Sequence, residues 1–327
     1  MMLAHSRRAA LLLLASAVAC TTQRRDPASA TIDEHLVHMS PGDVAAPVGS
    51  AGARAMRSNG LPASNGAAPA RLQATPRHAE WVKIAWEPGA TDSLMAWVVY
   101  PSTSNAKTPV VVVVHEIFGL STWVRGVADQ VAADGFIAIA PDLLSRVRGG
   151  ASTVELTGDS ARKIIAEVGM PERMKGITAV ANYGMSLASA APRYGVIGYC
   201  WGGSTTWGAA VYNSKGFSGG VAFYGSPFMT GPVPTADSLA RIVKPVMLLN
   251  GSKDARIGAA MPAIDSIMKT NGKSYVGINY EGAVHGFLRA QDDPKATRDP
   301  VEEAANLAAT KDGWPRTIAF LKKTLGA

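Results

Sequence analysis

The sequence predicts an α/β fold built on a doubly wound, mostly parallel sheet with an antiparallel hairpin at its N-terminal edge. From residue 109 onward, short runs rich in β-branched residues alternate with segments in which apolar residues have helical spacing. The runs are apolar throughout, which is typical of parallel strands covered by helices on both faces. No internal repeat interrupts the alternation, so we expect one domain of roughly 250 residues.

The expected elements follow one another along the chain. A hairpin comes first, with strands at 81–86 and 94–100 on either side of the turn Pro88-Gly89. Later strands are expected at 109–114, 136–140, 195–198, 219–223, 245–249 and 274–280. Helices are expected at 123–133, 174–187, 202–211, 259–269 and 313–325.

Composition excludes several classes of protein. Hydrophobic residues make up 47% of the 327 residues and charged residues 17%, which excludes a disordered chain and a highly charged coiled coil. The formal net charge is +7, but Arg7 and Arg8 lie in a leader that we expect to be removed, and the other charges are spread thinly. The sequence shows no row of basic residues that could contact successive phosphates, so nucleic acid is not expected as a partner. The only cysteines, Cys20 and Cys200, exclude a disulfide scaffold.

The N-terminus has the features of an export signal. Two arginines precede an apolar run at 9–18 that is too short to cross a bilayer, and small residues end at Ala19. Residues 1–19 are therefore predicted to be a signal peptide. Cleavage there would leave Cys20 first, where it resembles the acylated cysteine of a bacterial lipoprotein; ordinary secretion with an incidental Cys20 is the alternative. In both cases we expect an exported protein, either periplasmic or anchored to a membrane through lipid.

The next segment, residues 20–76, is rich in Ala, Pro, Gly and Ser. It shows neither helical nor strand periodicity, so we interpret it as a flexible linker. The folded domain is then expected at residues 77–327.

The predicted chemistry is centred on Cys200. The run from Gly198 to Gly202 stands between an expected strand and an expected helix, with the spacing of a G-x-S-x-G nucleophile elbow and Cys in place of Ser. Glycines at these two positions avoid clashes around a nucleophile whose backbone is strained. The N-terminus of the following helix would stabilise the thiolate. A lone Cys is often only a small buried side chain, but this context favours a catalytic nucleophile.

Two further residues complete a candidate triad. In the α/β-hydrolase layout an acid and a base follow the nucleophile along the chain. Asp254 follows the strand expected to end at residue 249, and His285 follows the strand expected to end at residue 280. His285 would take up the thiol proton, and Asp254 would orient the imidazole. The sequence therefore predicts an α/β-hydrolase fold with a Cys-Asp-His triad, and neither a cofactor nor a metal is expected.

From residue 109 to its end the chain resembles the dienelactone hydrolase family. The matching segments are 115–119, 141–143, 198–203, 251–254 and 285–287. The resemblance implies that Glu116 contacts the resting thiol and releases it when substrate binds. It also implies that Ile117 and Trp201 supply backbone N–H groups to the oxyanion hole and that Arg289 binds a substrate carboxylate. The chain has His115 where many members have Gln, and Trp201 where Leu is common.

Alternatives stay open for two of these residues and for the function. Glu116 could instead be a salt-bridged carboxylate at the sheet edge, and Arg289 could solvate the surface or pair with Asp292 or Asp293. The predicted function is hydrolysis of a small ester or lactone through a Cys thioester acyl-enzyme. The alternatives are a broader carboxylesterase acting on polymeric esters, and a non-catalytic binding lipoprotein of the cell envelope, since a fold alone does not determine function.

Overall fold

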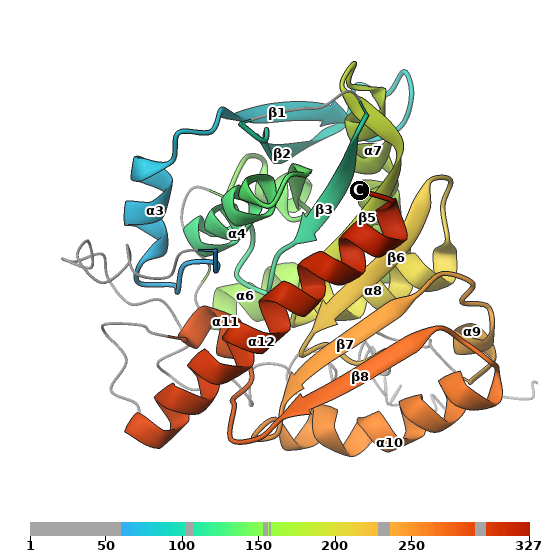
Figure 1. The fold of residues 1–327 in the computed structure, drawn as a ribbon. Helices are drawn as coiled ribbons and strands as arrows, with labels where there is room; N and C mark the ends of the chain where they lie inside the picture. Colours follow the sequence, from blue (N-terminus) through green and yellow to red (C-terminus); the bar gives the residue numbers. More distant parts are fainter. Residues whose placement is uncertain (1–59, 103–106, 153–155, 157, 228–235, 292–298) are drawn as a thin grey trace, which may run out of the picture.

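A single mixed sheet organises the chain. The structure is a computed structural model that describes residues 60–102, 107–152, 156, 158–227, 236–291 and 299–327. Within them the strand order is β1-β2-β4-β3-β5-β6-β7-β8 (Figure 1). β1 (Ala79–Ala85) pairs antiparallel with β2 (Ser93–Val99), and β2 pairs antiparallel with β4 (Ile137–Asp142).

The remaining pairs are parallel. Their strands are β3 (Thr108–Val114), β5 (Ala190–Tyr199), β6 (Phe217–Phe223), β7 (Val246–Gly251) and β8 (Tyr275–Tyr280). The predicted sheet, mostly parallel with an antiparallel N-terminal hairpin, is therefore confirmed. β3 has β4 on one side and β5 on the other, so the strand order reverses there, and ligands bind at such a reversal, beyond the carboxyl ends of the strands.

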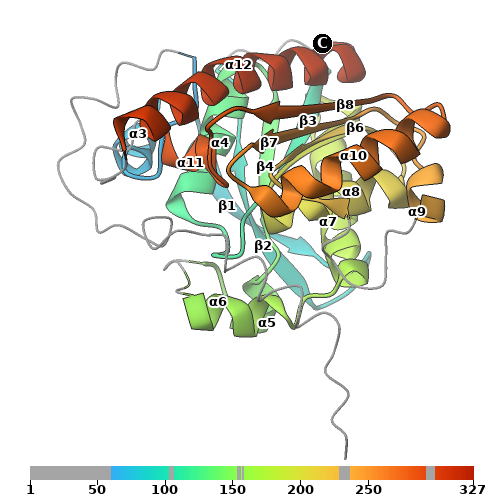
Figure 2. The same cartoon turned by 90° about the horizontal axis from the view of Figure 1, so that it is seen from below.

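Helices cover both faces of the sheet (Figures 1 and 2). On β6, a side chain at Gly219 would contact the last helix, whereas one at the next residue, Gly220, would contact the helix that follows β5. Since neighbouring strand residues point to opposite faces, these two helices lie on opposite sides. The five helices expected from the sequence are all present: α4 (Thr122–Ala133), α7 (Met170–Ser186), α8 (Trp201–Tyr212), α10 (Ala255–Thr270) and α12 (Pro300–Leu325).

Short helices and the start of α12 were not expected. The short ones have only four to eight residues, too few for a periodic pattern: α3 (Ala68–Ala74), α5 (Ser145–Arg148), α6 (Gly158–Ile165), α9 (Ala236–Ala240) and α11 (Phe287–Ala290). α12 begins earlier than its periodicity indicates. Its Asp299 side chain accepts a hydrogen bond from the Val301 N–H, and Pro300 is the first helical residue, which is a sequence signal for a helix start.

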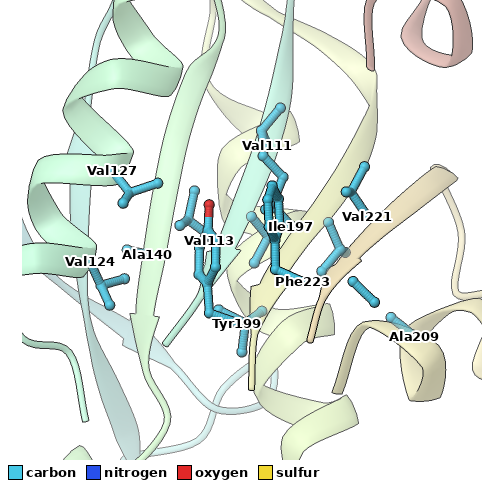
Figure 3. Close-up of a cluster of buried hydrophobic side chains, with 14 of the residues drawn as sticks. Val111, Val113, Val124, Val127, Ala140, Ile197, Tyr199, Ala209, Val221 and Phe223 are labelled. Carbon is cyan, nitrogen blue, oxygen red and sulfur yellow. The ribbon is translucent and has the colours of Figure 1, made fainter. Parts of the chain in front are cut away.

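The centre of the sheet is a continuous apolar core. Every residue of β3 is buried. Figure 3 shows side chains of β3, β5 and β6 at the centre, with Val124 and Val127 reaching in from α4. The Tyr199 ring at the end of β5 meets the Trp123 indole edge to face, with ring centroids 5.0 Å apart. Because protein interiors are close-packed, the ends of β3 and β5 are held in fixed positions, and so are the residues that follow them.

Residues 60–76 correct the prediction of a flexible linker, since this part packs against the domain. Arg77 Nη2 and Arg71 Nε lie 2.7 and 3.1 Å from Oδ2 of Asp129, a buried residue of α4. Ala68 of α3 lies against Gly126 of α4, where a side chain would crowd it. The contact between this segment and the domain uses small residues and one buried ion-pair cluster. The sequence of the segment therefore lacks the periodic apolar residues that would predict a packed helix. Residues 1–59, including the predicted signal peptide and Cys20, lie outside the described residues.

Asp129→Asn is expected to loosen this segment. Burial alone would raise the pKa of Asp129, but Arg77, Thr75 and Arg71 hold it below its usual value. A lowered pKa stabilises the fold above the pKa of the unfolded chain, and the contribution is lost as pH falls through the folded-state pKa. We expect Asp129→Asn to lower the free energy of unfolding at neutral pH by about 3 kcal/mol. Urea unfolding measures this, with the exposed Asp237→Asn as control; equal curves for both variants would contradict it.

Candidate active site

Cys200 occupies a strained turn between β5 and α8. Its backbone φ is 54° and ψ is −112°, a conformation that residues with a side chain rarely adopt. A side-chain carbon at Gly198 would overlap the carbonyl of Gly202, and one at Gly202 would overlap the carbonyl of Val114. Both glycines are therefore required by the close approach of α8 to β5 and β3. The geometry is that of a nucleophile elbow, with strain at the residue that would react.

His285 and Asp254 form a buried pair on neighbouring loops. His285 follows β8 and Asp254 follows β7, and the distance from Nδ1 of His285 to Oδ2 of Asp254 is 2.5 Å. Asp254 Oδ1 also accepts a hydrogen bond from the Ile257 N–H and so caps α10. The Asp254 carboxylate is thus held by a helix end while it orients the imidazole. Because Nδ1 is committed to Asp254, Nε2 is left for the Cys200 proton.

The charges of the three residues are coupled. Burial alone would lower the pKa of His285, but Cys200 and Asp254 raise it well above its usual value through charge and hydrogen bonding. Burial would raise the pKa of Asp254, and His285 lowers it below its usual value. The charged imidazole is thus favoured beside an ionised Asp254. A cysteine reacts as its thiolate, and a neighbouring cation favours that form.

Glu116 and Arg289 meet in the interior of the domain. Arg289 Nη1 donates to Oε2 of Glu116 at 2.7 Å, and the side chains are only 1% and 3% exposed for Glu116 and Arg289 respectively. The Arg289 guanidinium also lies over the Phe118 ring, 4.8 Å from its centroid. A surface role for Arg289 is therefore wrong. Asp292 and Asp293 lie outside the described residues, and contact of Glu116 with the thiol stays a prediction.

Tyr224 packs against His285 of the triad, and its place there was not predicted from the sequence. Its ring centroid lies 5.0 Å from that of His285. Burial raises the pKa of Tyr224, the charges of Glu116 and Cys200 raise it further, and Arg289 opposes them. The hydroxyl thus lies within electrostatic reach of all three. The sequence signal is weak, since only the position of Tyr224 directly after β6, at the same sheet edge, could have indicated it.

The two predicted oxyanion-hole residues lie at the same edge of the sheet. Ile117 is buried in the loop after β3, and Trp201 is the first residue of α8. The backbone N–H of a first helical residue has no acceptor within its own helix. The Trp201 N–H is therefore available at the residue directly after the nucleophile. The donor roles of Ile117 and Trp201 stay predictions that this placement allows.

The N-terminal segment makes hydrogen bonds next to Arg289 that were not predicted from the sequence. The Asn65 N–H donates to the Arg289 carbonyl at 2.9 Å, and Gln291 Nε2 donates to the Pro62 carbonyl at 2.9 Å. Trp123 Nε1 donates to the Ala63 carbonyl at 3.1 Å. Residues 62–65 thus contact both the Arg289 backbone and Trp123 of α4. They use only their backbone groups in these three bonds, so the amino-acid types of the segment do not reveal the contacts.

Among the described residues, no group of three or more His, Cys, Asp or Glu side chains is placed to hold a metal ion. None of the described helices has both the length and the apolar run that a bilayer span needs.

Comparison with known proteins identifies the family. The model of the dienelactone hydrolase family matches residues 94–325. The chain belongs to the dienelactone hydrolase family. The resemblance drawn from the sequence motifs is confirmed, and so is the expected enzyme class, a hydrolase of esters or lactones. Cys200, Asp254 and His285 all lie inside the matched region.

Relatives of this dienelactone hydrolase family member cover most of its length. A protein of Salmonella typhimurium, provisionally named carboxymethylenebutenolidase, is 28% identical over 265 residues, 79% of this chain and 93% of that one. A Bradyrhizobium protein, provisionally named 2-oxo-3-(5-oxofuran-2-ylidene)propanoate lactonase, is 28% identical over 253 residues, 74% of this chain and 93% of that one. A solved Klebsiella pneumoniae structure, provisionally described as a dienelactone hydrolase, has a TM-score of 0.61 and 24% identity, covering 75% of this chain and 98% of that one. The similarity to the Klebsiella pneumoniae structure confirms the fold.

Proposed function

We propose that the chain hydrolyses a small ester or lactone through a thioester formed on Cys200. The observation that carries this proposal is the buried hydrogen bond between His285 and Asp254 beside a cysteine at a strained elbow. The family and the names of its relatives support a carboxylic ester as the substrate class. A stopped-flow assay with 4-nitrophenyl acetate tests it, because an acyl-enzyme gives a burst of nitrophenol before steady turnover. A binding protein that retains only the fold would give neither a burst nor steady turnover.

The first half of the reaction forms the thioester. The Cys200 thiolate attacks the carbonyl carbon, and the developing oxyanion would accept hydrogen bonds from the Ile117 and Trp201 N–H groups. The bond from carbon to the leaving oxygen then breaks. The His285 imidazolium donates its proton to that oxygen, so an alcohol leaves or a lactone ring opens.

The second half releases the acid. Neutral His285 takes a proton from water as the water oxygen attacks the thioester carbonyl. The carbon–sulfur bond breaks, which restores the thiolate beside the imidazolium. Asp254 remains ionised and holds the same imidazole orientation in both halves. No other group is required to balance protons or electrons.

Arg289 is proposed to select anionic substrates. Its guanidinium already binds a carboxylate, that of Glu116, in a dry site where charge-assisted hydrogen bonds are strong. A substrate carboxylate would replace Glu116 at Arg289, and the displaced Glu116 would release the thiol for attack. A polyester hydrolase would not need this exchange, so the Glu116–Arg289 pair favours the narrower activity.

Arg289→Met is expected to lower kcat/KM for an anionic lactone by roughly 10- to 100-fold. The neutral 4-nitrophenyl acetate has no carboxylate to lose, so its hydrolysis should change much less. Since Arg289→Met alone would strand a buried carboxylate, the double variant Arg289→Met with Glu116→Gln is the matched control. The preference for the anionic substrate should be lost in both variants. Equal losses on both substrates would instead support the broader esterase.

Export of the protein is a further proposal, based on the leader. If Cys20 is acylated, more than one acyl chain would anchor the mature protein firmly in a membrane. The wild type should then sediment with membranes and dissolve in detergent, whereas Cys20→Ala should be soluble or unprocessed. Recovery of the wild type only in the soluble periplasmic fraction would favour plain secretion.

A further inference from the structure

Three side chains stack at the start of α8: His115, Trp201 and Arg173. The imidazole and the indole are nearly parallel, at 11°, with ring centroids 5.3 Å apart. Arg173, from α7, places its Cζ 4.0 Å from the indole centroid. All three residues are buried, so none of them serves a solvated surface. The stack joins the loop after β3 to the first turn of α8, the two places that carry the predicted oxyanion donors.

At one end of the stack, His115 holds the peptide unit of the first donor. Its Nε2 accepts a hydrogen bond from the Leu143 N–H at 3.2 Å, so Nδ1 carries the proton and donates to the Glu116 carbonyl at 2.6 Å. That carbonyl and the Ile117 N–H belong to the same planar peptide group. Because the C=O and N–H of a trans peptide point in opposite directions, the His115 hydrogen bond fixes the direction of the Ile117 N–H.

In the middle of the stack, Trp201 carries the second donor on its own backbone. Its indole Nε1 has no hydrogen-bond partner among the described residues. The ring is therefore held by the groups on its faces and not by its polar edge. The Trp201 carbonyl accepts a hydrogen bond from Thr205 Oγ1 at 2.9 Å. A shift of the indole would move the backbone of the residue that follows Cys200.

At the other end, Arg173 is a buried cation with no acidic partner among the described residues. Its Nε donates to the Val168 carbonyl at 3.0 Å, and Nη1 donates to Thr205 Oγ1 at 3.4 Å. Burial lowers the pKa of Arg173 to about 9, which still leaves it charged at neutral pH. A buried charge is costly, and the indole face offsets part of the cost through a cation–π contact. Arg173 thus contacts the face of the Trp201 ring directly, and it reaches the Trp201 carbonyl through the Thr205 hydroxyl.

We propose that His115 and Arg173 are positioning residues that fix the spacing and direction of the two oxyanion-hole N–H groups by packing against the Trp201 indole. This inference rests on the proposed thioester mechanism. Neither residue touches substrate. A donor displaced by a fraction of an ångström stabilises the oxyanion less, so the stack acts on the rate of acylation and not on substrate affinity.

Arg173→Met tests the inference, because it keeps the length of the side chain and removes the charge. We expect the rate constant of the 4-nitrophenyl acetate burst, which reports acylation, to fall by roughly 10- to 100-fold, with the ester concentration for half of the maximal burst rate nearly unchanged. Arg173→Lys restores a cation and should recover part of the burst rate. Arg316→Met is the control, since the exposed Arg316 of α12 pairs with Asp312, and its loss should leave the burst rate unchanged.

Alkylation by iodoacetamide separates this inference from the proposed function. Alkylation needs the thiolate but no oxyanion hole, so Arg173→Met should react with iodoacetamide at the wild-type rate. Failure of the wild type to react would reject the nucleophile itself. Equal falls in acylation and alkylation, or no fall in acylation, would overturn the positioning role. If Arg173→Met does not fold, His115→Gln carries the same comparison, because Gln keeps a donor and an acceptor but removes the stacked ring.

Discussion

Cys200→Ala is expected to abolish ester hydrolysis, with kcat/KM falling on the order of 10⁴- to 10⁶-fold. The thiolate is the only nucleophile in the proposed mechanism, and alanine leaves nothing to form the acyl-enzyme. Cys200→Ser should retain a small residual rate, because a hydroxyl at the elbow can still give its proton to His285. It would be slow, since serine does not form a stable anion beside the imidazolium as the thiol does.

Folding controls make this result interpretable. Cys200 is fully buried, and alanine and serine are no larger, so both variants fit the space. The backbone strain at the positive φ of 54° is also the same for cysteine, alanine and serine, since each has a side-chain carbon there. We expect thermal unfolding of both to stay close to that of the wild type. A folded Cys200→Ala protein with full activity would contradict the mechanism.

Asp254→Asn is expected to lower kcat by on the order of 10⁴-fold, as the equivalent change does in serine proteases. An amide at this position no longer selects the imidazole tautomer with the proton on Nδ1. It also removes the charge that helps to raise the pKa of His285. The imidazolium would then lose its proton at lower pH. The ionisation of His285, followed by NMR of its imidazole, should therefore move to lower pH in Asp254→Asn.

The same substitution carries its own stability control. Asp254 caps α10 by accepting a hydrogen bond from the Ile257 N–H, and Asn is about as good a capping residue as Asp. The cap on α10 is therefore retained, and kcat should fall in Asp254→Asn protein that circular dichroism shows to be folded. Unchanged kcat in Asp254→Asn would show that His285 does not depend on this carboxylate.

The triad could be predicted from the sequence because its signals are local. Each of Cys200, Asp254 and His285 lies within five residues of the end of a strand, and a parallel sheet brings the carboxyl ends of its strands to one edge. The glycines around Cys200 are needed by close backbone contacts, which a short motif records. The hairpin and the buried strands were predictable for the same reason, since their residue patterns repeat within a few positions.

The rest depended on contacts between distant residues. Glu116 and Arg289 are separated by 173 positions, and nothing near either one indicates that they pair. Arg173 stands on a helix whose spacing was predicted, but its place over Trp201 follows from how α7 packs against α8. The docking of residues 60–76 relies on small residues, on backbone hydrogen bonds and on a single buried aspartate. Composition therefore suggested a linker where the fold has a packed segment.

One measurement tests the central claim most directly. The protein is mixed with 4-nitrophenyl acetate, quenched in acid within the burst, digested, and analysed by mass spectrometry. We predict one acetyl group on the peptide that contains Cys200, labile to hydroxylamine at neutral pH as a thioester is, and no such label in Cys200→Ala. Turnover with no label on Cys200, or with the acetyl group on another residue, would contradict the account.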